Sequence, residues 1–211
     1  MENTQEILRR LEQVYLDAKP ALHYKNAYEL LVATILSAQC TDVRVNKVTE
    51  GLFLQYPDAA HLAMADQQEL EQRIHSCGCY SVKARNLIET AKRLVQNFQG
   101  EVPKTMEELT TLAGVGRKTA NVVLSNAFGI PGIAVDTHVF RVSNRLGLAH
   151  AKDVQKTEEQ LMALIPKEKW GNAHHWLIYH GRQVCSARKP HCATCFLNDI
   201  CPSANKDGSQ T

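Results

Sequence analysis

Apolar positions recur at spacings of three and four along most of the chain, a pattern that predicts amphipathic helices. Residues 3–18 and 81–98 show this pattern most clearly, each with one apolar face. The segment 30–36 is apolar all round, which is typical of a helix in the middle of a bundle. Since no segment shows sustained period-two alternation, the sequence predicts an all-α protein.

Polar residues at the start of several patterns predict helix N-caps. Four pairs have the spacing of a capping box: Asn3 with Glu6, Asn26 with Glu29, Asp66 with Glu69, and Thr105 with Glu108. Pro20 is predicted to end the first helix, and Gly100 the helix over 81–98. Further helices are predicted over 42–55, 66–75, 136–146, 153–165 and 172–182.

Composition narrows the class of protein only slightly. The 211 residues are 44% hydrophobic, enough for one sizeable core or two small ones. A net charge of +2 does not identify a nucleic-acid protein, so any DNA-binding face must come from local clustering. The polar N-terminus MENTQEILRR does not resemble a signal peptide, and no apolar run approaches the ~20 residues of a membrane span. Seven cysteines, an odd number, without an export signal indicate the reducing cytosol.

Two glycines stand between two apolar helical patterns in the segment Leu-Ala-Gly-Val-Gly, residues 112–116. Gly114 and Gly116 permit a tight turn and leave backbone N–H groups bare where the next helix begins, which favours anion binding. A P-loop is excluded because Arg117 intrudes between Gly116 and Lys118, and a dinucleotide fingerprint because position 119 is threonine. The glycines alone are equally consistent with an anion site and with a helix–turn–helix corner that binds no ligand.

Four of the seven cysteines lie between residues 185 and 201 with the spacing C-x6-C-x2-C-x5-C. A closed four-thiolate site suits either Zn²⁺ or a [4Fe–4S] cluster. Zinc sites usually present two short cysteine pairs, whereas this segment has one pair and two outlying ligands, so the spacing favours iron–sulfur. By contrast, Cys77-Gly-Cys79 has a poor spacing for one metal, and we interpret it as two small loop thiols.

Three motifs together resemble a known family. L-A-G-V-G-R-K-T-A (112–120) followed by V-D-T-H-V-F-R (135–141) closely resembles the helix-hairpin-helix and catalytic aspartate of the endonuclease III family of DNA glycosylases. S-A-Q-C-T-D (37–42) and the cysteine spacing are similar to the same family, so the resemblance covers nearly the full length. It implies a two-domain helix-hairpin-helix glycosylase fold with a C-terminal [4Fe–4S] loop. It also implies an enzyme that removes oxidised pyrimidines from duplex DNA and cleaves the abasic site by β-elimination.

The resemblance assigns roles to individual residues. Lys118 is implied as the nucleophile that forms a Schiff base, and Asp136 as the carboxylate that accepts protons or steadies the positive sugar. Gln39, otherwise an ordinary exposed loop residue, is implied to enter the gap left by a flipped base. Cys79 departs from several relatives, which carry a bulky apolar wedge there. The expected DNA contacts are Gln39, Cys79, Gly114, Gly116, Arg117, Thr119, His138, Arg188 and Lys189, and the expected cluster ligands are Cys185, Cys192, Cys195 and Cys201.

Connectivity suggests two domains. One, about 21–130, holds the helix-hairpin-helix (about 106–125); the other joins 1–20 to 131–211 and carries Asp136 and the cluster. Lys118 and Asp136 are expected to face each other across the groove between domains. The expected partner is double-stranded DNA with damaged bases or abasic sites, bound by a monomer. The chain is expected to be cytoplasmic, associated with the nucleoid through DNA, with no membrane partner.

The sequence alone leaves two other functions open. Adenine-mismatch DNA glycosylases resemble this family and carry the same type of cluster, but they lack the lysine nucleophile and have a large extra C-terminal domain. A non-enzymatic DNA-binding module with a hairpin and a cluster is the second alternative. It leaves Lys118, Asp136 and Gln39 unexplained.

Overall fold

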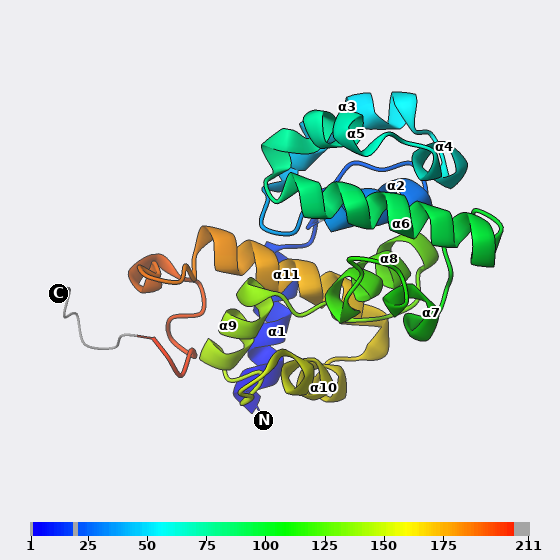
Figure 1. Cartoon of the computed structure of the whole chain (residues 1–211). Helices are drawn as coiled ribbons and strands as arrows, with labels where there is room; N and C mark the ends of the chain where they lie inside the picture. The colour runs from blue at the N-terminus through cyan, green and yellow to red at the C-terminus, as the bar shows by residue number, and fades with distance from the viewer. Residues whose placement is uncertain (1, 19–20, 205–211) are drawn as a thin grey trace. The chain divides into compact units, whose positions relative to one another are not determined.

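The computed structural model describes residues 2–18 and 21–204, which form α-helices and short 3-10 helices (η) and contain no strand (Figure 1). The all-α prediction is therefore confirmed. In order, the elements are α1 (Glu2–Val14), α2 (Ala27–Leu36), α3 (Asp42–Gln55), α4 (Ala59–Ala63), α5 (Gln67–Ile74), η1 (His75–Cys77), α6 (Tyr80–Phe98), α7 (Met106–Thr110), α8 (Arg117–Phe128), α9 (Thr137–Arg145), α10 (Val154–Leu164), η2 (Lys167–Lys169), α11 (Trp170–Gln183) and η3 (Cys192–Thr194).

The chain divides into two compact units, each with its own apolar core. Pro20–Ile130 forms the first, which we call the hairpin unit because it contains α7 and α8. Met1–Lys19 and Pro131–Thr211 together form the second, which we call the cysteine unit because the four clustered cysteines belong to it.

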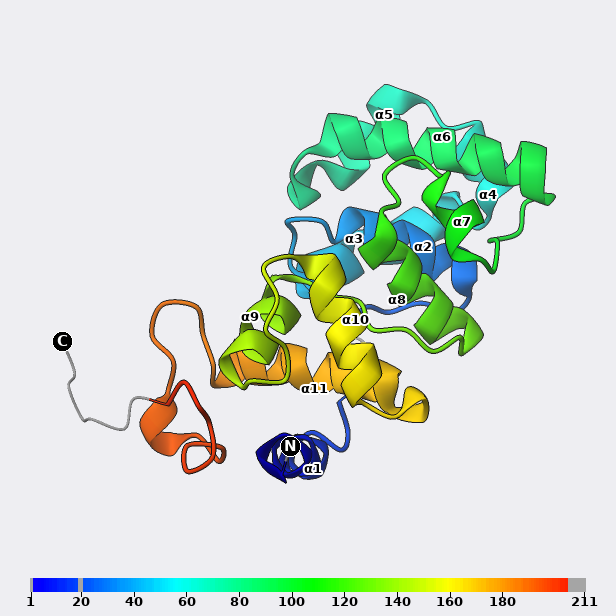
Figure 2. The ribbon, with the colours of Figure 1, turned by 90° about the horizontal axis from the view of Figure 1, so that it is seen from below.

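The hairpin unit is built around α2. Every residue of this helix from Tyr28 to Leu36 is buried, and α2 packs against α3, α6 and α8. The expectation that a helix apolar all round lies inside a bundle is confirmed. The longest helix, α6, runs beside α4 and α5 and also contacts α2 (Figure 2).

The cysteine unit is built on α11, which packs against α9 and α1, while α10 packs against α9. Its core includes Leu11 from α1, Val142 from α9 and Leu177 from α11, each fully buried. Leu197, between the third and fourth clustered cysteines, is buried in the same core. The cysteine segment is therefore anchored to the unit by its own apolar side chain as well as by polar contacts.

Three of the four predicted caps are confirmed: the side chains of Asn26, Asp66 and Thr105 accept from the backbone N–H three residues later. Asn3 was predicted wrongly, since α1 already begins at Glu2 and Asn3 lies inside it. Asn3 and Glu6 are therefore one turn apart inside the helix, where the Glu6 carboxylate accepts hydrogen bonds from Arg9 and Arg10.

Other helix ends differ by a few residues from the predicted ones. The first helix ends at Val14 instead of continuing to 18, and its predicted terminator Pro20 lies outside the described residues. At the end of α6, the left-handed backbone begins at Gln99 (φ 56°), one residue before Gly100. None of the described helices is long and apolar enough to cross a membrane.

Candidate functional site

The turn between α7 and α8 has a backbone that depends on glycine. Gly114 has φ +74°, a left-handed conformation. A Cβ at this position would lie 2.9 Å from Nδ2 of Asn86 and 3.2 Å from its Cβ, so a side chain is excluded by both conformation and space. Gly116 is the N-cap of α8 and, as a glycine, has no side chain that could cap this helix. The N-terminus of α8 therefore suits an anion.

Arg117 and Lys118 are the first two residues of α8, and both side chains are exposed. Thr119 follows on the same turn and is half-buried. The Lys118 amine thus lies at an exposed helix N-terminus directly after the glycine turn. This arrangement combines a nucleophilic side chain with backbone donors that suit a phosphate.

Asp136 is the N-cap of α9. Its Oδ1 accepts hydrogen bonds from the backbone N–H groups of His138 and Val139, both at 2.8 Å. Among the described residues, no hydrogen bond engages the second carboxylate oxygen, Oδ2. The His138 ring is half-buried, with Nδ1 3.2 Å from the Arg141 guanidinium. Asp136 therefore caps the helix through Oδ1 alone.

Gln39 and Cys79 are both exposed, and both have left-handed backbones, with φ of 54° and 47°. Such values are uncommon away from glycine and indicate positions held by their surroundings. Lys83 ties the two segments together, because its Nζ donates to the carbonyls of Leu36 and Cys77, each at 2.8 Å. The structure therefore brings these two predicted site residues into neighbouring loops of the hairpin unit.

Cys77 differs from the loop thiol that its sequence context predicted. It closes η1 and is only 2% exposed, packed in the core of the hairpin unit. A free cysteine behaves as a small hydrophobe, and the η1 turn folds this one inward while Cys79 stays outside. Burial, together with the neighbouring Cys40 thiol, raises the pKa of Cys77 to about 11.

All four clustered cysteines line one cavity of about 220 Å³ in the cysteine unit. Leu146, His180 and Pro190 complete much of its wall. Burial raises the pKa values of the Cys195 and Cys201 thiols, and the neighbouring cysteines raise them further because nearby thiolates repel. Iron cations would remove that repulsion, so the cysteines fit a cluster that all four would ligate. In the described residues, no three His, Cys, Asp or Glu side chains gather as a site for one metal ion.

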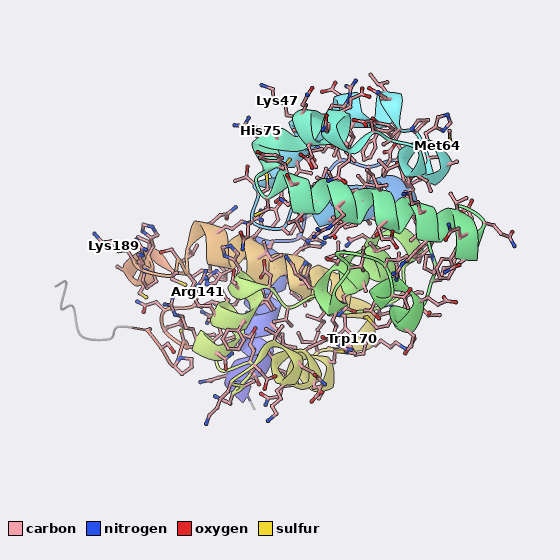
Figure 3. All side chains as sticks on the ribbon, in the orientation of Figure 1. Lys47, Met64, His75, Arg141, Trp170 and Lys189 are labelled. Carbon is pink, nitrogen blue, oxygen red and sulfur yellow. The ribbon has the colours of Figure 1, made fainter. Side chains whose placement is uncertain are left out.

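Two arginines of α9 hold the first part of the cysteine segment. Arg145 donates to the carbonyls of Ser186 and Ala187 at 2.7 and 2.9 Å, and its guanidinium lies 3.4 Å from the Cys185 sulfur. Arg141 donates to the Cys185 carbonyl (Figure 3). Hydrogen bonds and positive charge around sulfurs that ligate a metal orient those sulfurs and shift the reduction potential of the cluster.

Arg10 of α1 holds the last part of the segment. It donates to the Phe196 carbonyl at 2.9 Å and forms an ion pair with Asp199 at 2.7 Å. Sequence reasoning missed Arg10, Arg141 and Arg145. The only available signal was the spacing of Arg141, which ends the V-D-T-H-V-F-R motif, and Arg145, which follows four residues later.

Arg188 and Lys189 are exposed between the first two cysteines, and Lys189 lies at the outer edge of the loop (Figure 3). The loop is closed on itself, since the Ser186 hydroxyl donates to the Lys189 carbonyl and the His191 N–H to the Val184 carbonyl. Two cations are thus displayed on a constrained loop. Lys118 belongs to the hairpin unit, whereas Asp136 and this loop belong to the cysteine unit.

Comparison with known proteins gives two family matches. Residues 32–167 match the HhH-GPD superfamily of base excision DNA repair proteins, and residues 185–201 match the iron–sulfur binding domain of endonuclease III. The chain is 56% identical over 200 residues to Endonuclease III of Synechocystis sp., covering 94% of this chain and 91% of the relative. It is 45% identical to Endonuclease III of Escherichia coli K12, with 95% of each chain covered.

A solved structure agrees with these matches. "Structure of a Trapped Endonuclease III-DNA Covalent Intermediate: Estranged-Adenine Complex" superimposes with a TM-score of 0.93 at 46% identity, covering 97% of each chain. "Structure of a Thermostable Thymine-DNA Glycosylase" shares the fold, with a TM-score of 0.88 at 22% identity.

Fold, site and matches define the class as a helix-hairpin-helix base excision DNA repair protein with an iron–sulfur segment at its C-terminal end. Within that class, the chain belongs to the endonuclease III family, and it is a DNA glycosylase/lyase. The predicted family, fold and enzyme class are confirmed. So is the [4Fe–4S] cofactor, for which the four cysteines around one cavity are the ligand set present.

Proposed function

We propose that this enzyme removes oxidised pyrimidines from duplex DNA and then cleaves the abasic site by β-elimination, with Lys118 as nucleophile. The observation that carries the proposal is the exposed Lys118 amine on the first turn of α8, directly after the Gly114 turn. The solved relative described as a trapped covalent DNA intermediate supports a covalent route. The donors at the start of α8 bind a DNA phosphate and so fix the amine relative to the strand.

The chemistry follows from a primary amine. Lys118 Nζ attacks the anomeric carbon of the sugar, the bond to the base breaks, and the base leaves with a proton. The C1′–O4′ bond of the sugar then breaks and O4′ takes a proton, which leaves an iminium between Lys118 Nζ and C1′. This iminium acidifies the neighbouring C2′ proton. Loss of that proton forms a carbon–carbon double bond as the 3′ phosphate leaves. Asp136 Oδ2 stabilises the positive sugar and accepts a proton, a role that the oxygen engaged by α9 cannot fill.

DNA recognition is divided among several exposed or half-buried groups. Gln39 and Cys79 enter the duplex where the damaged base leaves the stack. Arg117, Thr119 and the glycine turn contact phosphate, as does His138 beside Asp136. Arg188 and Lys189 add phosphate contacts from the cysteine loop, and the cluster holds that loop in shape. We also propose that the enzyme acts as a monomer in the cytoplasm on nucleoid DNA, since one chain carries every residue assigned to the reaction.

Borohydride reduction tests the nucleophile. Wild-type enzyme mixed with a duplex containing thymine glycol should give a covalent adduct mapped by mass spectrometry to Lys118. A duplex with an A·G mismatch and an undamaged duplex should give none, and an adduct or base release on the mismatch alone would favour adenine excision. Lys118→Ala should abolish base release and strand cleavage while damaged DNA still binds. Lys92→Ala, which removes an exposed lysine of α6, is the matched control and should trap normally.

A further inference from the structure

One face of α6 carries polar side chains that reach three separate segments of the hairpin unit. Lys83, Asn86, Thr90 and Arg93 follow one another at spacings of three and four, so they lie on the same face of the helix. Thr90 Oγ1 donates to the Ala113 carbonyl at 2.8 Å, and the Arg93 guanidinium donates to the Thr111 carbonyl. Asn86 packs against Gly114. These three residues support the turn before α8.

Lys83, at the other end of this face, supports the loops that carry Gln39 and Cys79. It is only 5% exposed, and its Nζ donates to the last carbonyl of α2 (Leu36) and the last carbonyl of η1 (Cys77). Carbonyls at helix ends lack intrahelical partners, and a cation is favoured there. An ammonium is nevertheless costly to bury, so apolar packing alone gives no reason for lysine at this position.

The two loops need such an anchor. Gln39 lies three residues after Leu36, and Cys79 lies two residues after Cys77. Both have left-handed backbones at non-glycine residues, which persist only where the surroundings impose them. With a rise of about 1.5 Å per residue, Lys83 and Thr90 lie about 10 Å apart along α6. A single rigid helix therefore sets the distance from the two loops to the hairpin turn.

We infer that Lys83 is a positioning residue for duplex opening: it locks the loops of Gln39 and Cys79 to α6, in register with the phosphate-binding hairpin. The inference rests on the proposed function, in which Gln39 and Cys79 enter the duplex. Lys83 is buried and does not itself touch DNA. It acts by holding two exposed residues where a base has left the stack, while Thr90 and Asn86 hold the turn that binds the backbone.

Lys83→Met is the test, because methionine keeps an unbranched apolar stem and removes the charge and the donors. The ratio of affinities for an abasic-analogue duplex and an undamaged duplex should fall about tenfold, as two buried carbonyls lose their partner and the loops lose register. Affinity for undamaged duplex should stay within about twofold, since the hairpin and its support are intact. The fluorescence of 2-aminopurine opposite the abasic analogue should rise on binding wild-type enzyme and rise less with the variant.

Leu94→Ala is the matched control for lost stability. Leu94 is 1% exposed on the same helix, in its C-terminal half. This cavity-forming change should lower the melting temperature yet leave both the affinity ratio and the aminopurine signal as in wild type. A Lys83→Met enzyme with the wild-type ratio and signal would overturn the assignment. So would an equal loss in Leu94→Ala.

Two further variants separate this inference from the proposed function. If Gln39→Ala keeps the wild-type ratio and signal, the insertion role itself is wrong, and the Lys83 assignment falls with it. If Gln39→Ala loses both and Lys83→Met loses neither, only the positioning role is wrong. Should Lys83→Met not fold, Lys83→Gln, which keeps an N–H donor on a shorter side chain, is measured instead with the same expected losses. If both fail to fold while Leu94→Ala folds, Lys83 is structural and the inference is overturned.

Discussion

The N-cap role of Asp136 is compatible with the catalytic role that we propose for it. A carboxylate has two oxygens, and the N-cap of α9 uses only Oδ1, which accepts from two backbone N–H groups. The cap therefore does not exclude the proposed catalytic role at this position. The cap also fixes the side-chain rotamer, so Oδ2 points in a defined direction without further partners among the described residues.

Asp136→Asn should separate the two roles. Asparagine is as good an N-cap as aspartate, so the melting temperature should change little, whereas single-turnover base release should slow by about 10²–10⁴. Asp153→Asn is the matched control, because Asp153 caps α10 by accepting from the Lys156 N–H at 2.8 Å. The control should react at the wild-type rate. A wild-type rate in Asp136→Asn would leave Asp136 as a cap alone.

The two thiols of the Cys-Gly-Cys segment should react very differently. Iodoacetamide at pH 8 should alkylate the exposed Cys79 and spare Cys77, whose pKa is raised to about 11 chiefly by burial. Peptide mapping by mass spectrometry measures both sites in one sample. Denatured protein is the control and should be alkylated at both positions. Equal labelling of the two thiols in the folded enzyme would contradict the buried position of Cys77.

At the scale of helices and loops, local signals predicted more than long-range ones. Caps such as Asp66 and Thr105 need only a side chain and a backbone N–H three residues away, so they can be read from the sequence. The five-residue α4 was not predicted, because so short a helix has no full apolar period. The contacts of Arg141 and Arg145 were missed because they reach backbone carbonyls about 40 residues further along the chain.

The same distinction between local patterns and long-range contacts applies to the residues of the candidate site. The cysteine spacing, the glycine turn and the order Lys118–Asp136 are local patterns and led directly to the family. Lys83 was not singled out, since its partners are the ends of two other helical segments and only the fold brings them together. The prediction that Cys77 is a loop thiol was wrong for a related reason. The segment Cys-Gly-Cys does not indicate which of its two sulfurs faces the core.

The cysteine loop gives a prediction of its own. If Lys189 contacts a phosphate, Lys189→Ala should weaken binding to damaged and undamaged duplexes alike. The slope of log affinity against log salt should flatten by about one unit. Lys152→Ala, which removes another exposed lysine of the cysteine unit, should leave the slope unchanged. An unaltered slope in Lys189→Ala, with iron content intact, would mean that this loop does not touch DNA.

At the scale of the whole molecule, acid should destabilise the fold partly through one histidine. Burial lowers the pKa of His175 to about 4, from 6.5 in an unfolded chain. Between these values the unfolded state binds a proton that the folded state does not, so the free energy of unfolding falls as pH decreases from 6.5 to 4. The shift corresponds to at most about 3 kcal/mol.

His175→Gln should therefore flatten the dependence of unfolding free energy on pH between 7 and 5, measured by urea denaturation with the cluster intact. His150→Gln is the control, because His150 is an exposed histidine of the same unit, and it should keep the wild-type pH dependence. Identical curves for the two variants would show that His175 titrates alike in the folded and unfolded chain.

The division of the cysteine unit between the two ends of the chain sets an order for folding during synthesis. The hairpin unit is continuous in sequence, so its core is complete once Ile130 has left the ribosome. α1 is translated before the hairpin unit, but most core partners of Ile7 and Leu11 come from residue 133 onward. At about 5–20 residues per second, the apolar face of α1 stays without these partners on the nascent chain for roughly 10 s. The four clustered cysteines are translated after α9, α10 and α11, so iron incorporation at these cysteines would follow the synthesis of the helices that form the core of this unit.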